Sequence, residues 1–325
     1  MAQDILVVGE LVDGQPAAHT DQLLGAATRL SEGGSVDVTL LGSGATTAAS
    51  SVFEAGADRA FLSDDAGYDE FRPDQWVAAV EAALDQANPA VVLITQSTVG
   101  LDLGPRLAFR RAAAVATNCM RVEMEDGSLR ATRPCYAGNA LATFSFTVAP
   151  AIVTLREKSQ DPLAERRTGF AGETVELPET GETQVTIAGF EQSEVEGLQL
   201  QDASIVVSGG RGLGGPEGFQ LVEELAQAFG VERATTGASR AAVDLDWYPT
   251  DRQVGLTGKV VSPDLYVAVA ISGASQHMAG CGGSKTIVAV NRDEEANIFK
   301  SSRFGIVGDY KQVLPPLIEA IKNLD

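Results

Sequence analysis

The first third of the chain alternates short apolar runs with stretches whose apolar residues recur at helical spacing. The runs predict strands, because several apolar or β-branched residues in a row are typical of strands buried on both faces. In one stretch Trp76, Val80, Ala83 and Leu84 fall on one face of a helix that Asn88-Pro89 ends. The predicted elements are Ile5–Val8, Thr20–Leu30, Val36–Leu41, Thr46–Ala55, Arg59–Leu62, Pro73–Ala87 and Val91–Thr95. This order of strands and helices implies a parallel sheet covered by helices.

The pattern changes after Arg111, where alternating residues on either side of a turn replace the amphipathic stretches. Met120–Glu125 and Leu129–Arg133 flank Asp126-Gly127-Ser128 and predict a β-hairpin. Further strands are expected at Thr143–Val148 and Ile152–Leu155. We therefore expect antiparallel edge strands to be added to the parallel sheet.

The residues from Glu157 to Asp202 have few large apolar side chains and carry eleven acids among Pro, Gly and Thr. One short strand-like piece, Val185–Ile187, interrupts them. This composition predicts a surface excursion and interdomain linker. The chain is thus expected to hold an N-terminal Rossmann-like α/β domain over residues 1–156, an acidic linker over 157–202, and a C-terminal parallel-sheet α/β domain over 203–325.

The C-terminal domain repeats one arrangement, in which a strand leads directly into a loop of small residues. Ser204–Ser208 leads into Gly209–Gly215 and a helix from Pro216 to Phe229, and Leu265–Ala270 leads into Ser272–Gly280 before the strand Thr286–Val290. Glycines let a backbone approach a phosphate, and helix N-termini favour anions. Two further loops, Thr236–Arg240 and Gln253–Lys259, are polar and contain glycine. Such loops gather at the carboxyl ends of parallel strands, so a nucleotide-containing cofactor is expected there, although each loop alone could be a tight connection.

Composition and charge narrow the function further. The chain has 325 residues, 44% of them apolar, and no apolar run approaches the roughly 18 residues of a membrane span. No signal peptide is apparent, so a cytoplasmic protein without membrane insertion is expected. The 44 acidic and 24 basic residues give a net charge of −20, which argues against nucleic-acid binding. Acids spread along the whole chain favour a halophilic source over an ordinary acidic mesophile, because concentrated salt screens their repulsion.

Few residues suggest acid–base or covalent catalysis, since the chain lacks the HExxH, GxSxG and GxxxxGK[ST] patterns. Of the two histidines, His19 is expected at the surface or as a cap, whereas His277 lies in a small-residue loop and either faces a bound ring or is structural. Arg211 and Arg240 adjoin such loops and are candidates for a pyrophosphate or a ring face. Cys281 is expected to be a small filler, and the three cysteines suggest neither a disulfide framework nor a metal site.

Several stretches together resemble the alpha subunits of electron transfer flavoproteins. Those that carry the resemblance are Val207–Leu213, Gly237–Asp244, Gln253–Lys259, Ile271–His277, Ser284–Asn291 and Phe304–Asp309, with looser likeness at Ala26–Leu30 and at Tyr136–Leu141, in which Asn139 is expected to be a turn residue. The resemblance covers essentially the whole chain. It implies a heterodimer with a beta subunit, with FAD held mainly by the C-terminal domain.

The resemblance also implies which residues line the FAD site. Thr257 would place its hydroxyl near flavin N5, His277 would lie near the C2 carbonyl, and Arg240 would lie against the isoalloxazine. Asn291 and Asp309 would lie toward the adenosine half. The full implied set is Arg211, Ser239, Arg240, Val254, Gly255, Leu256, Thr257, Ser272, Gly273, Ala274, Ser275, Gln276, His277, Asn291 and Asp309.

Two positions depart from the family pattern, and both leave the redox potential open. Leu256 stands where many members have Gln, so a side-chain hydrogen bond near the flavin is expected to be missing while backbone contacts persist. Ser275 replaces a commonly apolar residue. A fixed cation about 4 Å from the charge on a reduced flavin would stabilise it by about 4 kcal/mol at an effective dielectric near 20, so Arg240 is expected to raise the potential.

The implied role is that of an electron carrier without substrate chemistry of its own. FAD would accept electrons from flavin-containing dehydrogenases, such as those of fatty acid β-oxidation that act on acyl-CoA thioesters, and deliver them to a membrane quinone oxidoreductase. One alternative is a subunit of an electron-bifurcating complex that oxidises NADH, which requires a second flavin in the partner. Two others are an NAD-dependent enzyme with a similar nucleotide fold and a structural partner with an empty site.

Overall fold

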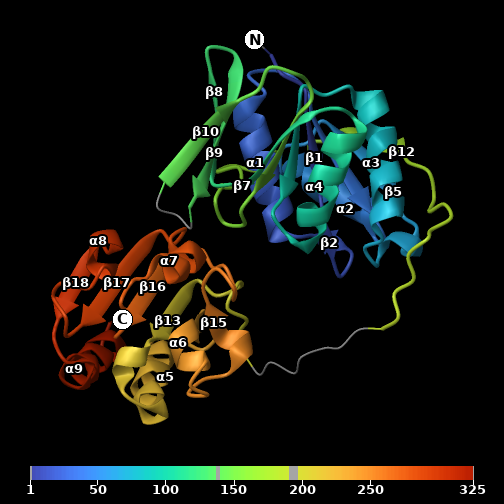
Figure 1. The fold of residues 1–325 in the computed structure, drawn as a ribbon. Coiled ribbons are helices and arrows are strands. Elements are labelled where there is room, and N and C mark those ends of the chain that lie inside the picture. Colours follow the sequence, from blue (N-terminus) through green and yellow to red (C-terminus); the bar gives the residue numbers. More distant parts are fainter. Residues whose placement is uncertain (1, 137–139, 190–196, 325) are drawn as a thin grey trace. The chain divides into compact units, whose positions relative to one another are not determined.

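The chain forms two compact units, each with its own sheet and core (Figure 1). The computed structural model describes residues 2–136, 140–189 and 197–324. The first unit is built from Met1–Pro134 and Leu141–Phe190, and the second contains Glu191–Asp325. Within the described part of the chain, no helix combines the length and the apolar character that a membrane crossing requires.

The first unit is organised around a seven-stranded sheet whose neighbouring strands run parallel, as the alternating pattern predicted. The sheet order is β12-β5-β4-β1-β6-β11-β7. Its strands are β1 (Ile5–Val8), β4 (Val36–Leu41), β5 (Arg59–Ser63), β6 (Val91–Thr95), β7 (Ala114–Cys119), β11 (Ala151–Leu155) and β12 (Glu173–Glu176). All residues of β1, β4, β6 and β11 are buried, which explains their continuous apolar runs.

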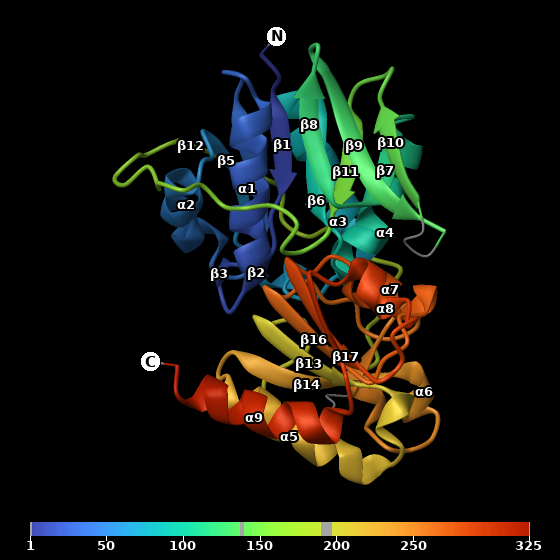
Figure 2. The same ribbon diagram turned by 90° about the vertical axis from the view of Figure 1, so that its left-hand side faces the viewer.

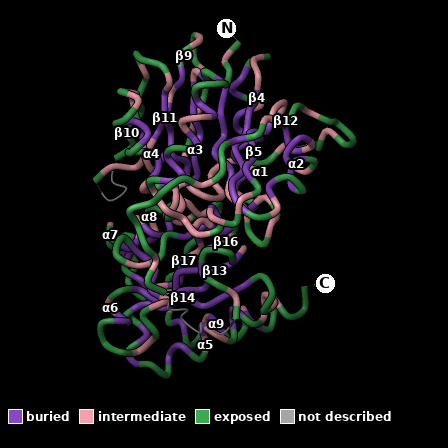
Figure 3. Tube along the Cα trace, turned by 90° about the vertical axis from the view of Figure 1, so that its right-hand side faces the viewer, coloured by how far each residue is buried: buried purple, intermediate pink, exposed green. Residues whose placement is uncertain are grey.

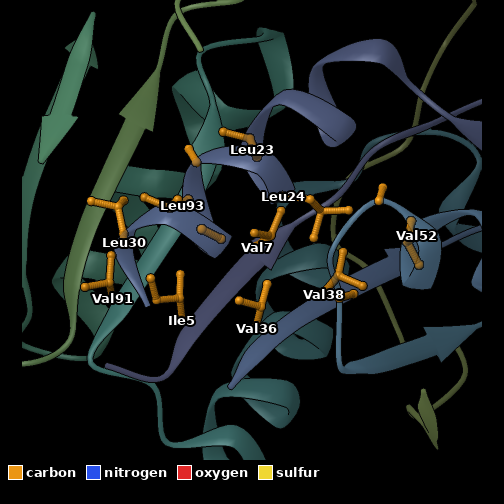
Figure 4. Packing of buried hydrophobic residues seen from close by; sticks show 14 of the residues in the cluster. Ile5, Val7, Leu23, Leu24, Leu30, Val36, Val38, Val52, Val91 and Leu93 are labelled. Carbon is orange, nitrogen blue, oxygen red and sulfur yellow. The ribbon is translucent and has the colours of Figure 1, made fainter. Parts of the chain in front are cut away.

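Helices cover both faces of this sheet. On one face, α1 (Ala18–Leu30) and α2 (Ala45–Glu54) pack on alternate side chains of the central strands, and Figure 4 shows Leu24 of α1 in one cluster with Val7 and Val38. On the other face, α3 (Pro73–Ala87) and α4 (Thr98–Arg110) contact the intervening side chains, including Leu6 and Val92. The sheet is accordingly the most buried layer of the unit (Figure 3).

Of the strands predicted to add an antiparallel edge, Ile152–Leu155 is instead β11, which pairs in parallel with β6 and β7 inside the main sheet. The predicted hairpin and the strand predicted at Thr143–Val148 are present, but they do not extend the parallel sheet. They form a separate three-stranded sheet from β8 (Arg121–Glu125), β9 (Ser128–Cys135) and β10 (Ala140–Ser145), in the order β10-β9-β8 (Figure 2). The edge of the main sheet is instead occupied by β7, a strand that the sequence pattern did not reveal. Leu129 and Ala131 of β9 belong to the same buried cluster as the apolar residues of α1, so the small sheet packs against this helix.

In the acidic segment 157–202, most of the described residues are exposed or half-buried, but part of the segment belongs to the main sheet. Residues of β12 pair in parallel with β5 and complete the main sheet. The side chains of Ser63 and Tyr68 both donate hydrogen bonds to the carbonyl oxygen of Pro178. No strand forms at Val185–Ile187, which contradicts the prediction. Asn139, predicted as a turn residue, lies outside the described residues.

The second unit contains a six-stranded parallel sheet with the order β15-β14-β13-β16-β17-β18. Helices α5 (Phe219–Ala228) and α9 (Tyr310–Lys322) pack on one face, and α7 (Ser275–Cys281) and α8 (Ile298–Ser301) on the other. The strands are β13 (Ile205–Gly209), β14 (Ala234–Ser239), β15 (Gln253–Val254), β16 (Leu265–Val269), β17 (Thr286–Asn291) and β18 (Phe304–Val307). Most of the predicted loop Thr236–Arg240 is therefore the end of a buried strand, because small side chains fit between the two helical layers.

Candidate functional site

The strand order of the second unit creates a switch point at the carboxyl edge of its sheet. The chain enters at β13, continues outward to β14 and β15, and then crosses back to β16 on the other side of β13. Figure 2 shows β14 and β16 on opposite sides of β13. The loops that follow β13 and β16 therefore leave the sheet in opposite directions. Ligands of doubly wound sheets bind in the crevice that such a reversal opens.

Glycines allow the two loops at this point to touch through their backbones. The N–H of Gly210 donates to the carbonyl oxygen of Val269 at 2.9 Å, and the N–H of Gly212 donates to that of Ala270 at 3.2 Å. A Cβ atom on Gly210 would lie 2.3 Å from the Ala270 oxygen, which no real side chain tolerates. The glycine-rich loop thus serves close packing of the loops, and this packing forms the floor of the crevice.

The crevice is a cavity of about 670 Å³ lined by loops from five strands. Twelve of the fifteen residues implied by the resemblance line it, namely Arg211, Ser239, Arg240, Val254, Gly255, Leu256, Thr257, Ser272, Ala274, Gln276, His277 and Asn291. Asp309 lines a cavity of about 290 Å³ whose walls share Arg211, Gly212 and Asn291 with the first. The structure therefore brings together residues that lie up to 98 positions apart in the sequence, from Arg211 to Asp309.

Gly273 and Ser275 line neither cavity. Gly273 has a φ of +78°, and a Cβ there would lie 2.2 Å from the backbone nitrogen of Ile298, so its role is to let two backbones meet. Ser275 opens α7, and its hydroxyl faces the side-chain oxygen of Gln276 at 3.3 Å. Both residues shape the loop that carries His277.

Positive charge is concentrated where the two cavities meet. Arg211 and Arg292 line both cavities, and within the described residues neither forms an ion pair. This arrangement is unusual in a chain of net charge −20 and leaves two guanidinium groups for an anion. Arg292 was missed by sequence reasoning, although its place directly after β17 is the available signal.

Arg240 is placed differently from the other two arginines. Its Nε atom lies 3.3 Å from Oδ2 of Asp244 one turn away, and its side chain is 65% exposed. Both residues line the larger cavity. Any field that Arg240 exerts on a ligand is therefore screened by solvent and opposed by the carboxylate, so it is weaker than that of an isolated cation.

His277 is a buried side chain with one ring nitrogen unused. Nε2 lies 2.9 Å from the hydroxyl of Tyr266, while Nδ1 is buried without a hydrogen-bond partner. Burial lowers the pKa of His277 to about 4, and the nearby backbone of Val254 opposes this shift only in part. The ring is therefore neutral at physiological pH. The backbone of Val254 is a hydrogen-bonding group that the protein itself places beside this ring.

Other polar groups of the site hold the walls in place. The Asn291 amide donates to the carbonyl oxygen of Ile271 at 2.9 Å, so its side chain ties two loops together. Gln253 donates to the Thr257 hydroxyl at 3.1 Å and orients it. The N–H of Leu256 is bound to the carbonyl oxygen of Gln276 at 2.8 Å, so this backbone group is not free for a ligand. Cys281 is fully buried, and burial raises the pKa of its thiol to about 12, which confirms its role as a filler.

Comparison with known proteins identifies the family. Residues 5–182 match the model of the electron transfer flavoprotein domain, and residues 199–282 match that of the electron transfer flavoprotein FAD-binding domain. The chain belongs to the electron transfer flavoprotein alpha subunit family. It is 35% identical over 327 residues to electron transfer flavoprotein subunit alpha of Bacillus subtilis, covering 100% of this chain and 99% of the relative. The subunit of Pseudomonas aeruginosa is 37% identical over 319 residues, covering 98% and 99%, and that of Mycobacterium leprae is 36% identical over 322 residues, covering 98% of each.

The second unit is thus an FAD-binding domain, and its residues fit the cofactor. A flavin dinucleotide needs cations for its pyrophosphate and polar partners for its ring, and it occupies an elongated site. Arg211 and Arg292, which line both cavities, provide cations for the pyrophosphate. His277 and Thr257, which both line the larger cavity, provide polar side chains for the ring. The two adjoining cavities together form the elongated site that the dinucleotide needs. In keeping with the family, the chain is a redox carrier rather than a conventional enzyme.

Proposed function

We propose that this chain pairs with an electron transfer flavoprotein beta subunit and holds FAD in the cavity at the β13/β16 switch point. The heterodimer takes electrons from flavin-containing dehydrogenases, such as those acting on acyl-CoA thioesters, and passes them to a membrane quinone oxidoreductase. The observation that carries the proposal is the pair of unpaired arginines between two adjoining cavities of an FAD-binding domain. A cytoplasmic location remains a prediction from the sequence.

In this proposal each part of the site has a separate task. Arg211 and Arg292 hold the pyrophosphate, and Asp309 and Asn291 border the adenosine half. Thr257, oriented by Gln253, and His277 face the isoalloxazine. FAD, when bound, supplies one-electron redox chemistry. The protein supplies fixed dipoles and cations that favour negative charge on the ring, and it needs no general base.

The proposal is tested by blocking the cavity. Ala274 is exposed on the cavity wall, and the substitution Ala274→Trp would fill the space with an indole. Val231 is 69% exposed and precedes β14 at the opposite edge of the sheet, so Val231→Trp is a matched control. Each variant is co-expressed with the beta subunit, and flavin per purified heterodimer is counted from absorbance after extraction.

We expect one FAD per heterodimer for the wild type and for Val231→Trp, and at least a tenfold lower occupancy for Ala274→Trp. Full occupancy in all three would place the flavin elsewhere. The match to an FAD-binding domain favours flavin over nicotinamide, and stoichiometric flavin would exclude the structural partner with an empty site. A second FAD per heterodimer, in place of a nucleotide without flavin, would favour the bifurcating alternative.

A further inference from the structure

Two arginines at the carboxyl edge of the sheet in the first unit lack an acidic partner. Arg156 directly follows β11, and Arg133 lies on β9, where its Nη1 donates to the Thr117 hydroxyl of β7 at 3.1 Å. Both arginines are half-buried. Neither forms an ion pair within the described residues, whereas most arginines of this unit do. Ligands of parallel α/β sheets bind at the carboxyl ends of the strands, so the pair occupies a usual place for a ligand.

The ends of three neighbouring strands fix the direction of Arg156. Asn118 of β7 has a φ of +61°, and its N–H donates to Oε1 of Gln96, next to β6, and to the hydroxyl of Thr154 on β11, both at 2.9 Å. Oδ1 of Asn118 in turn accepts a hydrogen bond from Nε of Arg156 at 2.6 Å. The guanidinium group is therefore ordered before a ligand arrives, which lowers the entropic cost of binding.

The surroundings of Arg156 disfavour its positive charge. Burial lowers the pKa of Arg156, and the positive charge of Arg133 lowers it further. Among the described residues, Cys119 acts in the opposite direction and no carboxylate does. A partly desolvated cation beside a second cation costs free energy, and a bound anion would offset this cost.

Several N–H groups of the two arginines remain available to a ligand. The contacts with Asn118 and Thr117 use only Nε of Arg156 and Nη1 of Arg133. Nη1 and Nη2 of Arg156 and Nη2 of Arg133 have no hydrogen-bond partner among the described residues, and none of these three atoms is enclosed by the protein. Nε of Arg133 is enclosed and unpartnered, so it is not available to a ligand.

We propose that Arg133 and Arg156 form a phosphate-binding site in the first unit, separate from the FAD cavity of the second unit. Two cations match the charge of a dianion. Their free N–H groups come from side chains on two different elements, and a tetrahedral phosphate presents oxygens to both. A planar carboxylate is already matched by the fork of a single guanidinium group, so it fits this pair less well.

Calorimetric titration of the FAD-loaded heterodimer with inorganic phosphate tests the site, with chloride holding the ionic strength constant. We expect one phosphate to bind, sulfate to compete as a dianion of the same shape, and formate, which represents carboxylates, to bind at least about tenfold more weakly. Absence of phosphate binding, or equal binding of formate, would overturn the proposal. The FAD content of the same sample, measured by absorbance, tests the proposed function separately. These measurements use the wild type, so they do not depend on the folding of a variant.

Three substitutions locate the bound phosphate on the heterodimer. Arg133→Gln and Arg156→Gln each remove one cation of the pair, and Arg29→Gln is the matched control. Arg29 is an exposed arginine of the same unit, forms no ion pair within the described residues, and donates to the carbonyl oxygen of Asp161 at 2.9 Å. We expect phosphate to bind at least about tenfold more weakly to each of the first two variants and with unchanged affinity to the control, because only the first two lose charge-assisted hydrogen bonds. Equal affinities in all three variants would overturn the assignment to Arg133 and Arg156.

Discussion

Burial of His277 makes the stability of the second unit depend on pH in a definite window. Its side chain is buried, which lowers its pKa to about 4, against 6.5 in the unfolded chain. Between these values the unfolded state binds a proton that the folded state does not bind. The free energy of unfolding therefore rises with pH through this window, and the stabilisation is fully present above 6.5 and lost as the pH falls toward 4.

The size of the effect follows from the shift. Each pKa unit corresponds to 1.36 kcal/mol of stability, so the shift from 6.5 to about 4 corresponds to about 3 kcal/mol. Between pH 5 and 6.5, the range that can be measured, the free energy of unfolding should change by about 2 kcal/mol. The variant His277→Gln lacks this pH-dependent contribution to stability. We expect the stability difference between the wild-type and His277→Gln heterodimers to shrink by about 2 kcal/mol as the pH falls from 6.5 to 5. Guanidinium unfolding followed at several pH values measures it.

The other histidine does not interfere with this measurement. His19 lies in the first turn of α1, where its side chain is half-buried and Nε2 is 3.6 Å from Oε1 of Glu10. Desolvation would lower the pKa of His19, but the hydrogen bond and charge of Glu10 and the charge of Glu157 together raise it. The contribution of His19 to the free energy of unfolding is therefore fully present below pH 6.5, and it is lost as the pH rises through the pKa of His19 in the folded state. A stability difference between wild type and His277→Gln that stays constant from pH 5 to 6.5 would refute the burial of a neutral His277.

Three further predictions concern charge. Arg240→Ala should lower the midpoint potential of the first electron, and Asp244→Asn should raise it. Each shift should be about 40 mV or less, because an exposed ion pair contributes about 1 kcal/mol at most. Shifts of the same sign in the two variants would contradict the geometry. Asp37→Asn should lower the melting temperature of the first unit, because Asp37 is fully buried and accepts a 2.9 Å hydrogen bond from Arg59. Breaking a buried ion pair costs about 3 kcal/mol or more. An unchanged melting temperature in calorimetry would be inconsistent with the burial of Asp37. Added KCl should raise melting temperatures if the charge of −20 reflects a halophilic source, and melting that is insensitive to KCl would disfavour it.

The sequence revealed the elements whose burial leaves a mark on composition. Strands such as β1 and β6 are buried on both faces and appear as apolar runs. By contrast, β12 is polar and largely exposed at the sheet edge, and only its pairing with β5 makes it a strand. The end of β14 is built from small polar residues that resemble a loop until the helices packed around them are known.

The candidate site was predictable to the extent that it follows the backbone. Loops at the carboxyl ends of parallel strands converge by geometry, so the loops that contain Arg211 and His277 could be placed together, whereas Asn291 was implied only by the family resemblance. Side-chain partners could not be inferred in this way. The contact between Tyr266 and His277 joins a strand to a helix eleven residues later, and the pairing of Arg240 with Asp244 depends on rotamers. Both alter the electrostatics expected from the sequence.

The most direct test of the central claim is an experimental structure of the heterodimer purified with its own flavin. We expect density for FAD across the β13/β16 switch point, with the pyrophosphate between Arg211 and Arg292 and the isoalloxazine in contact with His277. Density for FAD at another place, with these loops bare, would contradict the assignment of the site.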